Sequence, residues 1–270
     1  MTDSASCTDF TLGLSAERPT RAGPLRHAAG EYLPRHLHRL AFATVVLGGA
    51  YEEAGDAGRH RAAAGSVLLH RPYEHHLDRV EACGAEVIVI PLGVAWPGAS
   101  YGQLRDPDAI ARLAGQDPLA AGAELLEKFQ TGQPSAADWP DLLAGALRAD
   151  PALSIAAWAS EQGLSFGSVS RGFQQRYGVT PATYRLTQRV HHAIEALVRS
   201  DEPLAAVAVT CGFTDQAHMT HAVQRITSLT PLALRQSWSV ARLQCGHKRG
   251  GADGPSTKSS RPSLRRASAR

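Results

Sequence analysis

One pattern occurs twice between residues 154 and 235, and this repeat constrains the fold more than any other feature of the chain. In the first copy, apolar residues at helical spacing lead to Gly163 and Ser165, and in the second they lead to Gly212 and Thr214. The offset between the copies is 49 residues up to the glycine and 50 residues at the end of the motif, so the second copy holds one inserted residue. Two copies are too few for a solenoid, so we infer that one supersecondary unit is used twice.

Each copy predicts a helix, a tight turn and a second helix. The apolar residues follow the i, i+3, i+4 spacing of one helical face. Gly163 and Gly212 can end the first helix in a left-handed conformation without steric cost, and Ser165 and Thr214 offer oxygens that cap the second helix. This is the helix-turn-helix layout, whose second helix can enter a DNA major groove. An ordinary helical hairpin is the alternative for one copy alone, and the presence of two copies favours DNA binding.

The segment between the copies, 181–199, is compatible with a connecting helix. About 18 residues at 1.5 Å each would span about 27 Å. With the flanking elements, this length can place two recognition helices about one DNA turn, or 34 Å, apart.

Two stretches, GLSFGSVSRGFQQRYGVTPATY and PLAAVAVTCGFTDQAHMTHAVQRITSLTPLALR, resemble the DNA-binding domain of the AraC/XylS family of bacterial transcription regulators. With the residues just before them, they cover about a third of the chain. The second copy departs from the family pattern: Met219 and Val223 stand where an aromatic is usual, His221 replaces an arginine, and Ser228 replaces the terminal glycine. We therefore expect the first copy to carry more of the sequence recognition.

The resemblance assigns DNA-contacting positions residue by residue. The base-facing positions are Gly167, Ser168, Ser170 and Arg171 in the first recognition helix and Gln216, Ala217, His218, Thr220 and His221 in the second. Arg171 suits bidentate contact with guanine, and Gln216 suits contact with adenine. The candidates for phosphate contact are Arg176, Arg189 and Arg225. For Arg189 the alternative is a structural arginine paired with an acid such as Glu195.

The same helices also supply an apolar core. The predicted core residues are Val169, Phe173, Tyr184, Met219 and Val223.

The chain of 270 residues is long enough for about two domains. Residues 1–150 hold 13 Lys and Arg against 19 Asp and Glu, whereas residues 151–245 hold 8 against 5. An acidic N-terminal part and a basic C-terminal part favour a sensor domain followed by a DNA-binding domain. Residues 246–270, with 7 basic residues against 1 acidic, have almost no apolar residues and are predicted to be disordered.

Short apolar runs at 41–47, 66–70 and 86–90, separated by glycine turns, predict strands. Many short strands favour a sandwich or a small barrel. The stretch RAAAGSVLLHRPYEHHLDRV resembles the cupin-like sensor domain that many AraC/XylS regulators carry.

The predicted fold class is therefore α+β, with an N-terminal cupin-like β-barrel followed by an all-α double helix-turn-helix domain. The predicted divisions are a sensor domain at 1–105, a helical dimerisation and linker region at 106–150, the DNA-binding domain at 151–245 and the tail at 246–270.

Four histidines of the front region, His36, His38, His70 and His76, are candidates for binding a small-molecule effector. Metal-binding cupins use a His-x-His pair, a carboxylate and a later histidine. No carboxylate occurs at 39–44 after the pair, so we assign no metal and no cofactor. Plain surface or core histidines remain the alternative.

We predict a regulator of transcription rather than an enzyme. Its expected partners are double-stranded promoter DNA, a small-molecule effector, a second copy of the chain and, for an activator, RNA polymerase. The absence of a signal peptide and of an apolar run of about 18 residues predicts a soluble, cytoplasmic protein with no membrane partner. The alternatives are a cupin-type metalloenzyme with His36, His38 and His76 as ligands, and an architectural DNA-binding protein with a vestigial sensor.

Overall fold

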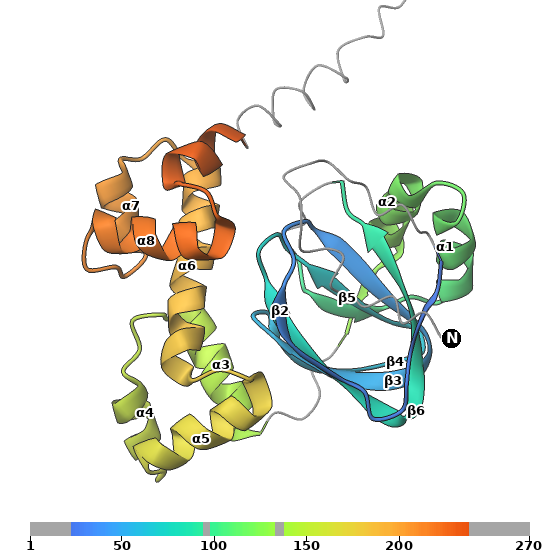
Figure 1. The fold of residues 1–270 in the computed structure, drawn as a ribbon, viewed down its shortest axis with the longest axis horizontal. Helices are drawn as coiled ribbons and strands as arrows, with labels where there is room; N and C mark the ends of the chain where they lie inside the picture. The colour runs from blue at the N-terminus through green and yellow to red at the C-terminus, as the bar shows by residue number, and fades with distance from the viewer. Residues whose placement is uncertain (1–22, 94–97, 133–137, 238–270) are drawn as a thin grey trace, which may run out of the picture.

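The computed structural model of the chain describes residues 23–93, 98–132 and 138–237. A strand-rich region comes first along the chain and a helical region follows it (Figure 1). The predicted α+β class with this order of regions is confirmed. The predicted tail at 246–270 lies outside the described residues.

One antiparallel sheet of eight strands forms the first region, as far as the described residues go. The strands are β1 (Leu25–His27), β2 (Tyr32–Leu37), β3 (Phe42–Gly55), β4 (Gly58–Ala63), β5 (Ser66–His70), β6 (His75–Pro91), β7 (Tyr101–Gln103) and β8 (Gln130–Thr131). The long strand β6 pairs with β3 along one edge and with β2 and β1 along the other. β3 also pairs with β4 and β5, so the two long strands β3 and β6 hold the sheet together.

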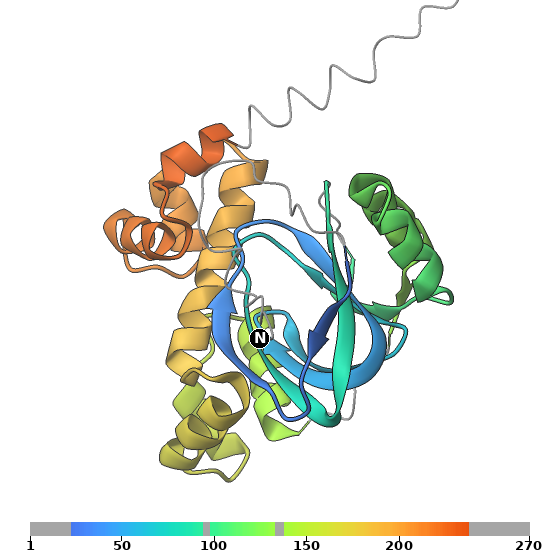
Figure 2. The same ribbon diagram turned by 45° about the vertical axis from the view of Figure 1, so that its right-hand side comes forward.

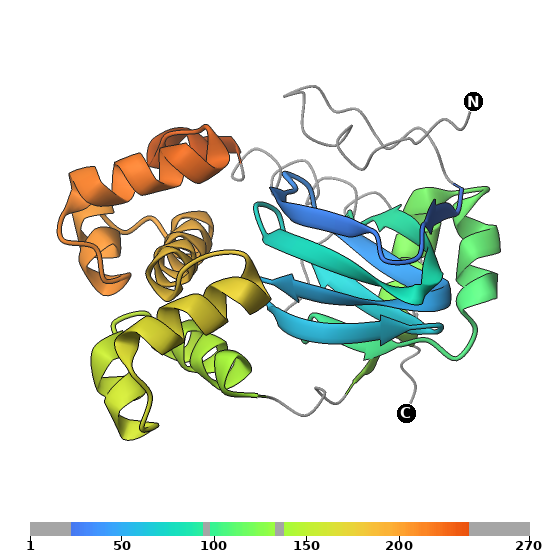
Figure 3. The same ribbon diagram turned by 60° about the horizontal axis from the view of Figure 1, so that its bottom comes forward.

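The sheet curls strongly, but its described strands do not close into a barrel (Figures 2 and 3). The bend of β3 and β6 lies at Gly49 and Gly84, which have φ of 69° and 71°. A Cβ at Gly49 would lie 2.0 Å from the carbonyl oxygen of Gly84, so only glycine fits there. The predicted barrel closure is wrong, because the short outer strands β1, β7 and β8 form no closing ladder among the described residues.

Two helices, α1 (Pro107–Ala114) and α2 (Pro118–Lys128), pack beside the sheet (Figure 2). Each begins with a proline that directly follows a capping aspartate. Ile110 and Leu125 are fully buried in one core with apolar residues of β3, β5 and β6.

The second region consists of helices. They are α3 (Trp139–Ala149), α4 (Ile155–Glu161), α5 (Phe166–Tyr177), α6 (Pro181–Arg199), α7 (Leu204–Thr210) and α8 (Gln216–Thr227), followed by helical residues 231–237. The first three pack with the start of α6 in a core that also takes in Ala54 and Leu77 of the sheet. α7 and α8 pack on the second half of α6 in a separate core.

The five residues predicted from the sequence to be core are all buried, which confirms that prediction. They are Val169, Phe173, Tyr184, Met219 and Val223.

Candidate nucleic-acid interface and histidine pocket

Two helix-turn-helix units lie at opposite ends of α6 (Figure 1). The first consists of α4 and α5 and the second of α7 and α8. The turn glycines Gly163 and Gly212 have φ of 67° and 77°, the left-handed conformation that the sequence predicted. The same local chemistry therefore shapes both units.

The N-terminal caps of the two recognition helices differ. Ser165 caps α5 as predicted, and its hydroxyl accepts a hydrogen bond from the backbone N–H of Ser168 (3.1 Å). The predicted cap Thr214 of α8 is wrong, because Asp215 takes that position and accepts from the backbone N–H of His218 (2.8 Å). The residue inserted into the second copy shifts the cap by one position.

The nine positions assigned to base contact lie in the first two turns of α5 and α8. Five are exposed, namely Ser168, Arg171, Gln216, Ala217 and His221. Four are partly exposed, namely Gly167, Ser170, His218 and Thr220. Among the described residues Arg171 has no hydrogen-bond or ion-pair partner, so its guanidinium is available to a ligand.

An exposed aromatic residue that the sequence analysis missed opens the first recognition helix. Phe166 is the first residue of α5, and 60% of its surface is exposed. Apolar side chains in a major groove contact the methyl group of thymine. The sequence signal was ambiguous, because Phe166 directly follows the serine cap but has the i, i+3, i+7 spacing to Val169 and Phe173 that is typical of the buried face.

Two of the three arginines assigned to phosphate contact are exposed. Arg176 lies near the end of α5 and Arg225 near the end of α8. The Nε atom of Arg176 lies 3.8 Å from Asp138, a loose ion pair at an exposed site.

The third, Arg189, is partly buried in α6. Its Nε donates a hydrogen bond to the carbonyl of Pro151 (3.1 Å) and lies against Gly212. Glu195, the alternative partner considered for it, instead pairs with Arg199 (2.7 Å). Arg189 therefore connects α6 to the segment before α4 and to the turn of the second unit.

The sheet and the helical region meet at one buried carboxylate. Asp56, after β3, pairs with Arg35, and its Oδ2 lies 3.0 Å from His75 Nδ1 and 3.0 Å from His191 Nε2 on α6. Burial would raise the pKa of Asp56, but Arg35 and the two histidines bring it well below its ordinary value. The carboxylate is therefore charged and holds α6 against the sheet.

Further hydrogen bonds strengthen this contact. The hydroxyl of Tyr184 and the amide of Gln188, both on α6, donate to the backbone carbonyl of Asp56 (2.9 and 3.1 Å). On α3, Asp141 binds Arg59 of β4 (2.7 Å). The first helix-turn-helix unit is thus anchored to the sheet by both α3 and α6.

Strand β2 and its extension contact the ends of both recognition helices. Arg35 donates to the carbonyl of Tyr177, the last residue of α5 (3.2 Å). Arg39 donates to the hydroxyl of Ser228, the C-cap of α8 (3.2 Å). Arginines at helix C-termini are favoured by the helix dipole. One short stretch of chain therefore contacts the C-terminal end of the recognition helix in each unit.

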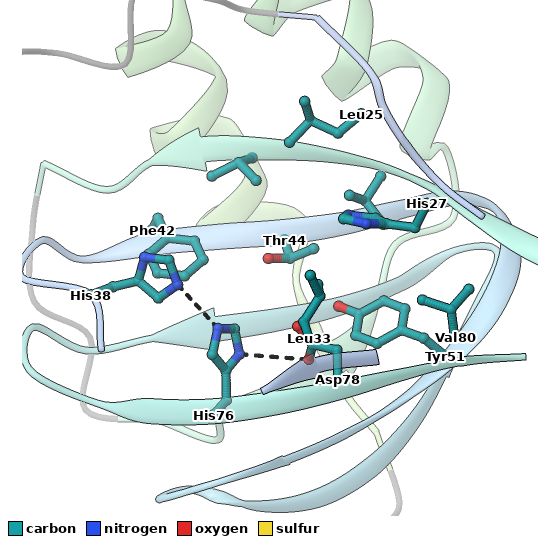
Figure 4. A pocket seen from close by; sticks show the side chains of 12 residues that line it. Leu25, His27, Leu33, His38, Phe42, Thr44, Tyr51, His76, Asp78 and Val80 are labelled. Carbon is teal, nitrogen blue, oxygen red and sulfur yellow. Dashed lines mark hydrogen bonds and ion pairs between the residues drawn. The ribbon is translucent and has the colours of Figure 1, made fainter. Parts of the chain in front are cut away.

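A pocket lies inside the sheet, and Leu33 and His38 from the same stretch of chain line it (Figure 4). The pocket encloses about 550 Å³, including its opening to solvent. Apolar side chains such as Leu33 and Val87 form much of its wall, and His38, His76 and Asp78 provide polar groups. In Figure 4 the ring of His76 lies between His38 and Asp78.

The structure brings together the four histidines proposed for effector binding. His76 Nε2 lies 2.9 Å from His36 Nε2 and 3.1 Å from His38 Nε2. The ring centre of His70 lies 4.7 Å from that of His76. Burial lowers the pKa of all four, to about 3 for His38 and His70. They are therefore neutral near neutral pH.

Three sets of residues place atoms with metal-ligand chemistry within 4.8 Å of one another in the described ranges. They are His36, His38 and His76; Glu53, His70 and His76; and Asp56, His75 and His191. The carboxylate that the sequence lacks after the His-x-His pair is thus supplied by β3. Sequence reasoning missed Glu53, Asp78, Asp56 and His191 because only strand pairing and domain packing bring them to the histidines.

The paired units with exposed recognition helices define a helix-turn-helix domain of the kind that binds double-stranded DNA. Residues 158–237 match the family described as "Helix-turn-helix domain". The "Probable transcriptional regulator LumQ" of Photobacterium leiognathi is 29% identical over 79 residues, which are 29% of this chain and 32% of that protein. The "HTH-type transcriptional activator RhaS" of Yersinia pestis (strain Pestoides F) is 27% identical over 122 residues, 45% of this chain and 39% of that protein.

Residues 158–237 are a helix-turn-helix domain of the AraC type, which confirms for this part of the chain the resemblance seen in the sequence. The chain spans between about a third and two fifths of the length of the curated relatives it matches.

Solved structures also show similarity. ToxT from Vibrio cholerae is 8% identical with a TM-score of 0.38, covering 82% of this chain and 97% of that one. The DNA-binding domain of AdpA, solved with a target DNA, is 26% identical with a TM-score of 0.37, covering 40% of this chain and 99% of that one. Because these TM-scores are low, the assignment of the domain rests on the sequence matches.

Within the described ranges, no helix has the length and apolar character needed to cross a membrane.

Proposed function

We propose that the protein regulates transcription by binding promoter DNA through α5 and α8, in response to a small molecule in the histidine pocket. The observation that carries the proposal is the pair of helix-turn-helix units joined by one helix, each with the start of its second helix exposed. The 19 residues of α6 span about 28 Å at 1.5 Å per residue, a length suited to recognition helices about one DNA turn apart.

In this proposal, base recognition is unequal between the two halves. Arg171 supplies the bidentate guanine contact in the first half, and Phe166 adds an apolar contact. In the second half Gln216 faces adenine, and His221 stands where the first half has Arg171. A histidine offers one donor at a time along a base edge, whereas arginine offers a fork.

The remaining contacts serve positioning. Exposed Arg176 and Arg225 are placed to meet phosphates. Arg189 has a structural bond to the carbonyl of Pro151, and its remaining guanidinium N–H groups are the part that could reach a phosphate.

Strand β2 supports an effector-responsive mechanism. His38 lines the pocket, and His36 contacts His76 of the pocket wall. Arg35 and Arg39 contact the ends of α5 and α8. A ligand that moves β2 by a small distance changes its contacts with both units at once. Such a ligand shifts the population between DNA-binding and non-binding arrangements only by its difference in affinity for them.

The remaining assignments follow from the same proposal. The protein acts in the cytoplasm as a homodimer, with α1 and α2 as the candidate contact, and an activator of this type would engage RNA polymerase. We assign a regulatory rather than an enzymatic role, because the matched relatives are named as regulators of transcription.

The DNA-binding part is tested by footprinting the full chain on the DNA that flanks its own gene. We expect a protected site and a loss of about 1–3 kcal/mol in binding free energy for Arg171→Ala. Arg26→Ala, which changes an exposed arginine on β1, is the matched control and should leave affinity unchanged. His221→Ala should cost less than Arg171→Ala. A wild-type chain that protects no site, or an Arg171→Ala variant that discriminates equally well, would overturn the assignment.

The effector part is tested separately by screening small molecules for a shift in melting temperature and in operator affinity. A compound that shifts both in the wild type, and neither in His38→Ala, supports the pocket. If none shifts either quantity, the architectural protein with a vestigial sensor becomes the better explanation.

A further inference from the structure

Strands β3 and β6 place two carboxylates side by side in the interior of the curled sheet. Glu53 on β3 is paired in register with Asp78 on β6, and only 5% and 7% of their surfaces are exposed. Like charges on directly opposite residues of an antiparallel pair disfavour the pairing, and buried charges normally have a partner of opposite sign. This arrangement requires either a proton or a cation between the two strands.

Two histidine nitrogens adjoin these carboxylates. Glu53 Oε2 lies 2.9 Å from His76 Nδ1 and 3.5 Å from His70 Nε2. Asp78 Oδ1 lies 3.8 Å from the same His76 Nδ1. His76 and Asp78 are two residues apart on β6 and so share a face of the sheet.

None of these four atoms has a hydrogen-bond partner among the described residues, although all are buried. They are Glu53 Oε2, His70 Nε2, His76 Nδ1 and Asp78 Oδ1. Buried polar side-chain atoms in folded proteins nearly always have a partner. The short distance from Glu53 Oε2 to His76 Nδ1 is thus a contact without hydrogen-bond geometry. Coordination to a shared ion would satisfy the atoms of Glu53, His70 and His76, which lie within 4.8 Å of one another. The charge of the ion would also offset that of Asp78.

The protonation states agree with the geometry. Burial raises the pKa of Glu53, and burial together with the charge of Glu53 raises that of Asp78 well above its ordinary value. Burial lowers the pKa of His70 to about 3 and that of His76 well below its ordinary value. Neutral imidazoles offer lone pairs to a metal ion, and a bound cation would supply the counter-charge that lets the two carboxyl groups ionise.

We propose that Glu53, His70 and His76 bind one divalent transition-metal ion between β3, β5 and β6, with the carboxylate of Asp78 beside it. Two imidazole nitrogens and one carboxylate oxygen suit zinc, iron(II) or manganese(II). Ligands about 2.0–2.2 Å from zinc in a tetrahedron lie about 3.3–3.6 Å from one another, close to the 2.9 and 3.5 Å that separate Glu53 Oε2 from the two histidine nitrogens.

The site is distinct from the set formed by His36, His38 and His76. It uses Nδ1 of His76, whereas His36 and His38 face Nε2 of the same ring. The proposal is independent of DNA binding, because its evidence lies wholly within the sheet.

The test is titration of the chelator-treated full chain with zinc by calorimetry and with cobalt(II) by visible spectroscopy. We expect one ion per chain and a rise in melting temperature with zinc. Glu53→Gln and His70→Gln should each weaken binding about tenfold or more, and they should change the visible spectrum of the bound cobalt. His192→Gln, which changes a histidine of α6 remote from the site, should bind as the wild type does.

Two outcomes would overturn the proposal. One is a wild-type chain that binds no zinc saturably. The other is a metal whose binding His36→Gln abolishes while Glu53→Gln and His70→Gln leave it intact, since the ion then lies on the Nε2 side of His76. Should Glu53→Gln not fold, His70→Gln decides the matter, with circular dichroism as the check on folding.

Discussion

Oδ2 of Asp56 lies 3.0 Å from Nε2 of His191, and this contact joins the sheet to the helix that carries both helix-turn-helix units. The two residues are 135 positions apart in the sequence. The same carboxylate binds Arg35 of β2 and His75 of β6. One buried negative charge therefore fixes α6 relative to the pocket.

Asp56→Asn should destabilise the protein strongly. The substitution leaves Arg35, whose side chain is 9% exposed, without a counter-charge. Breaking a buried ion pair from one side costs about 3–5 kcal/mol, which urea unfolding would show as a lower midpoint. Glu81→Gln, which breaks an exposed pair with Arg61, is the control and should change stability little. Equal midpoints for Asp56→Asn and the wild type would contradict the role of Asp56.

The contact between Asp56 and His191 should weaken above neutral pH. Burial lowers the pKa of His191, but its hydrogen bond with Asp56 and the charge of Asp56 raise it above its ordinary value overall. Because the pKa of His191 is higher in the folded than in the unfolded protein, protonated His191 stabilises the fold. This stabilisation is fully present below the unfolded pKa of about 6.5, and it is lost as the pH rises through the folded pKa. The pKa of Asp56 is lowered, so its own contribution is present above its ordinary value and lost in strong acid.

Unfolding free energy measured from pH 5 to pH 9 tests this prediction. The other charged or titratable groups that face the pair are Arg35, Arg71, Glu74 and His75. Burial raises the pKa of Glu74 to about 7, so its ionisation also lowers stability in this range. The informative quantity is therefore the difference between the wild type and His191→Gln, which should shrink above pH 6.5. A difference independent of pH would rule out a charged His191.

Gly178→Ala should cost more stability than Gly163→Ala. Both glycines have positive φ, 72° and 67°, so either alanine would pay about 1–2 kcal/mol for a left-handed backbone. A Cβ at Gly178 would also lie 2.7 Å from Cδ2 of Leu77, whereas at Gly163 it would meet nothing within 4 Å. Gly178→Ala should therefore lower the unfolding free energy by about 1–3 kcal/mol more than Gly163→Ala does, because of overpacking. This difference reports how tightly the end of α5 packs on the sheet. Equal losses in thermal unfolding would mean that Leu77 simply moves aside.

Ser228→Gly should stabilise the second unit. Ser228 has φ of 62°, a conformation that costs a non-glycine residue about 1–2 kcal/mol. The variant also loses the exposed hydrogen bond from Arg39, a smaller effect. Ser228→Ala is the matched control, because it loses the same hydrogen bond and keeps the backbone cost. We expect a higher unfolding free energy for glycine than for alanine, and equal values would contradict the prediction.

Much of the helical region could be predicted because its signals are local. The turn glycines, the cap Ser165 and the buried Phe173 and Val223 follow from residues within a few positions of one another. The prediction of Thr214 as a cap was wrong because one inserted residue, Asp215, offers a better acceptor at the start of α8. Local signals therefore predict the two units. The exact start of a helix depends on which of several neighbouring side chains caps it.

The histidine pocket was predicted in part. The pattern pointed to His36, His38, His70 and His76, and these do meet. Their carboxylate partners lie on strands whose register no local pattern reveals, since pairing of Glu53 with Asp78 depends on the bulges in β3 and β6. The closed barrel was wrong for a related reason, because closure requires the two edges of the sheet to pair with each other, and no local pattern shows whether they do.

The sequence alone determined the two helix-turn-helix units, since helix periodicity, glycine turns and caps are interactions between near neighbours. Only the tertiary structure decided how these units are held against the sheet and what surrounds the histidines. Those arrangements depend on contacts between residues far apart in the chain, such as Asp56 with His191. Burial then sets their charge states, because the cost of removing an ionisable group from water depends on what folding places around it.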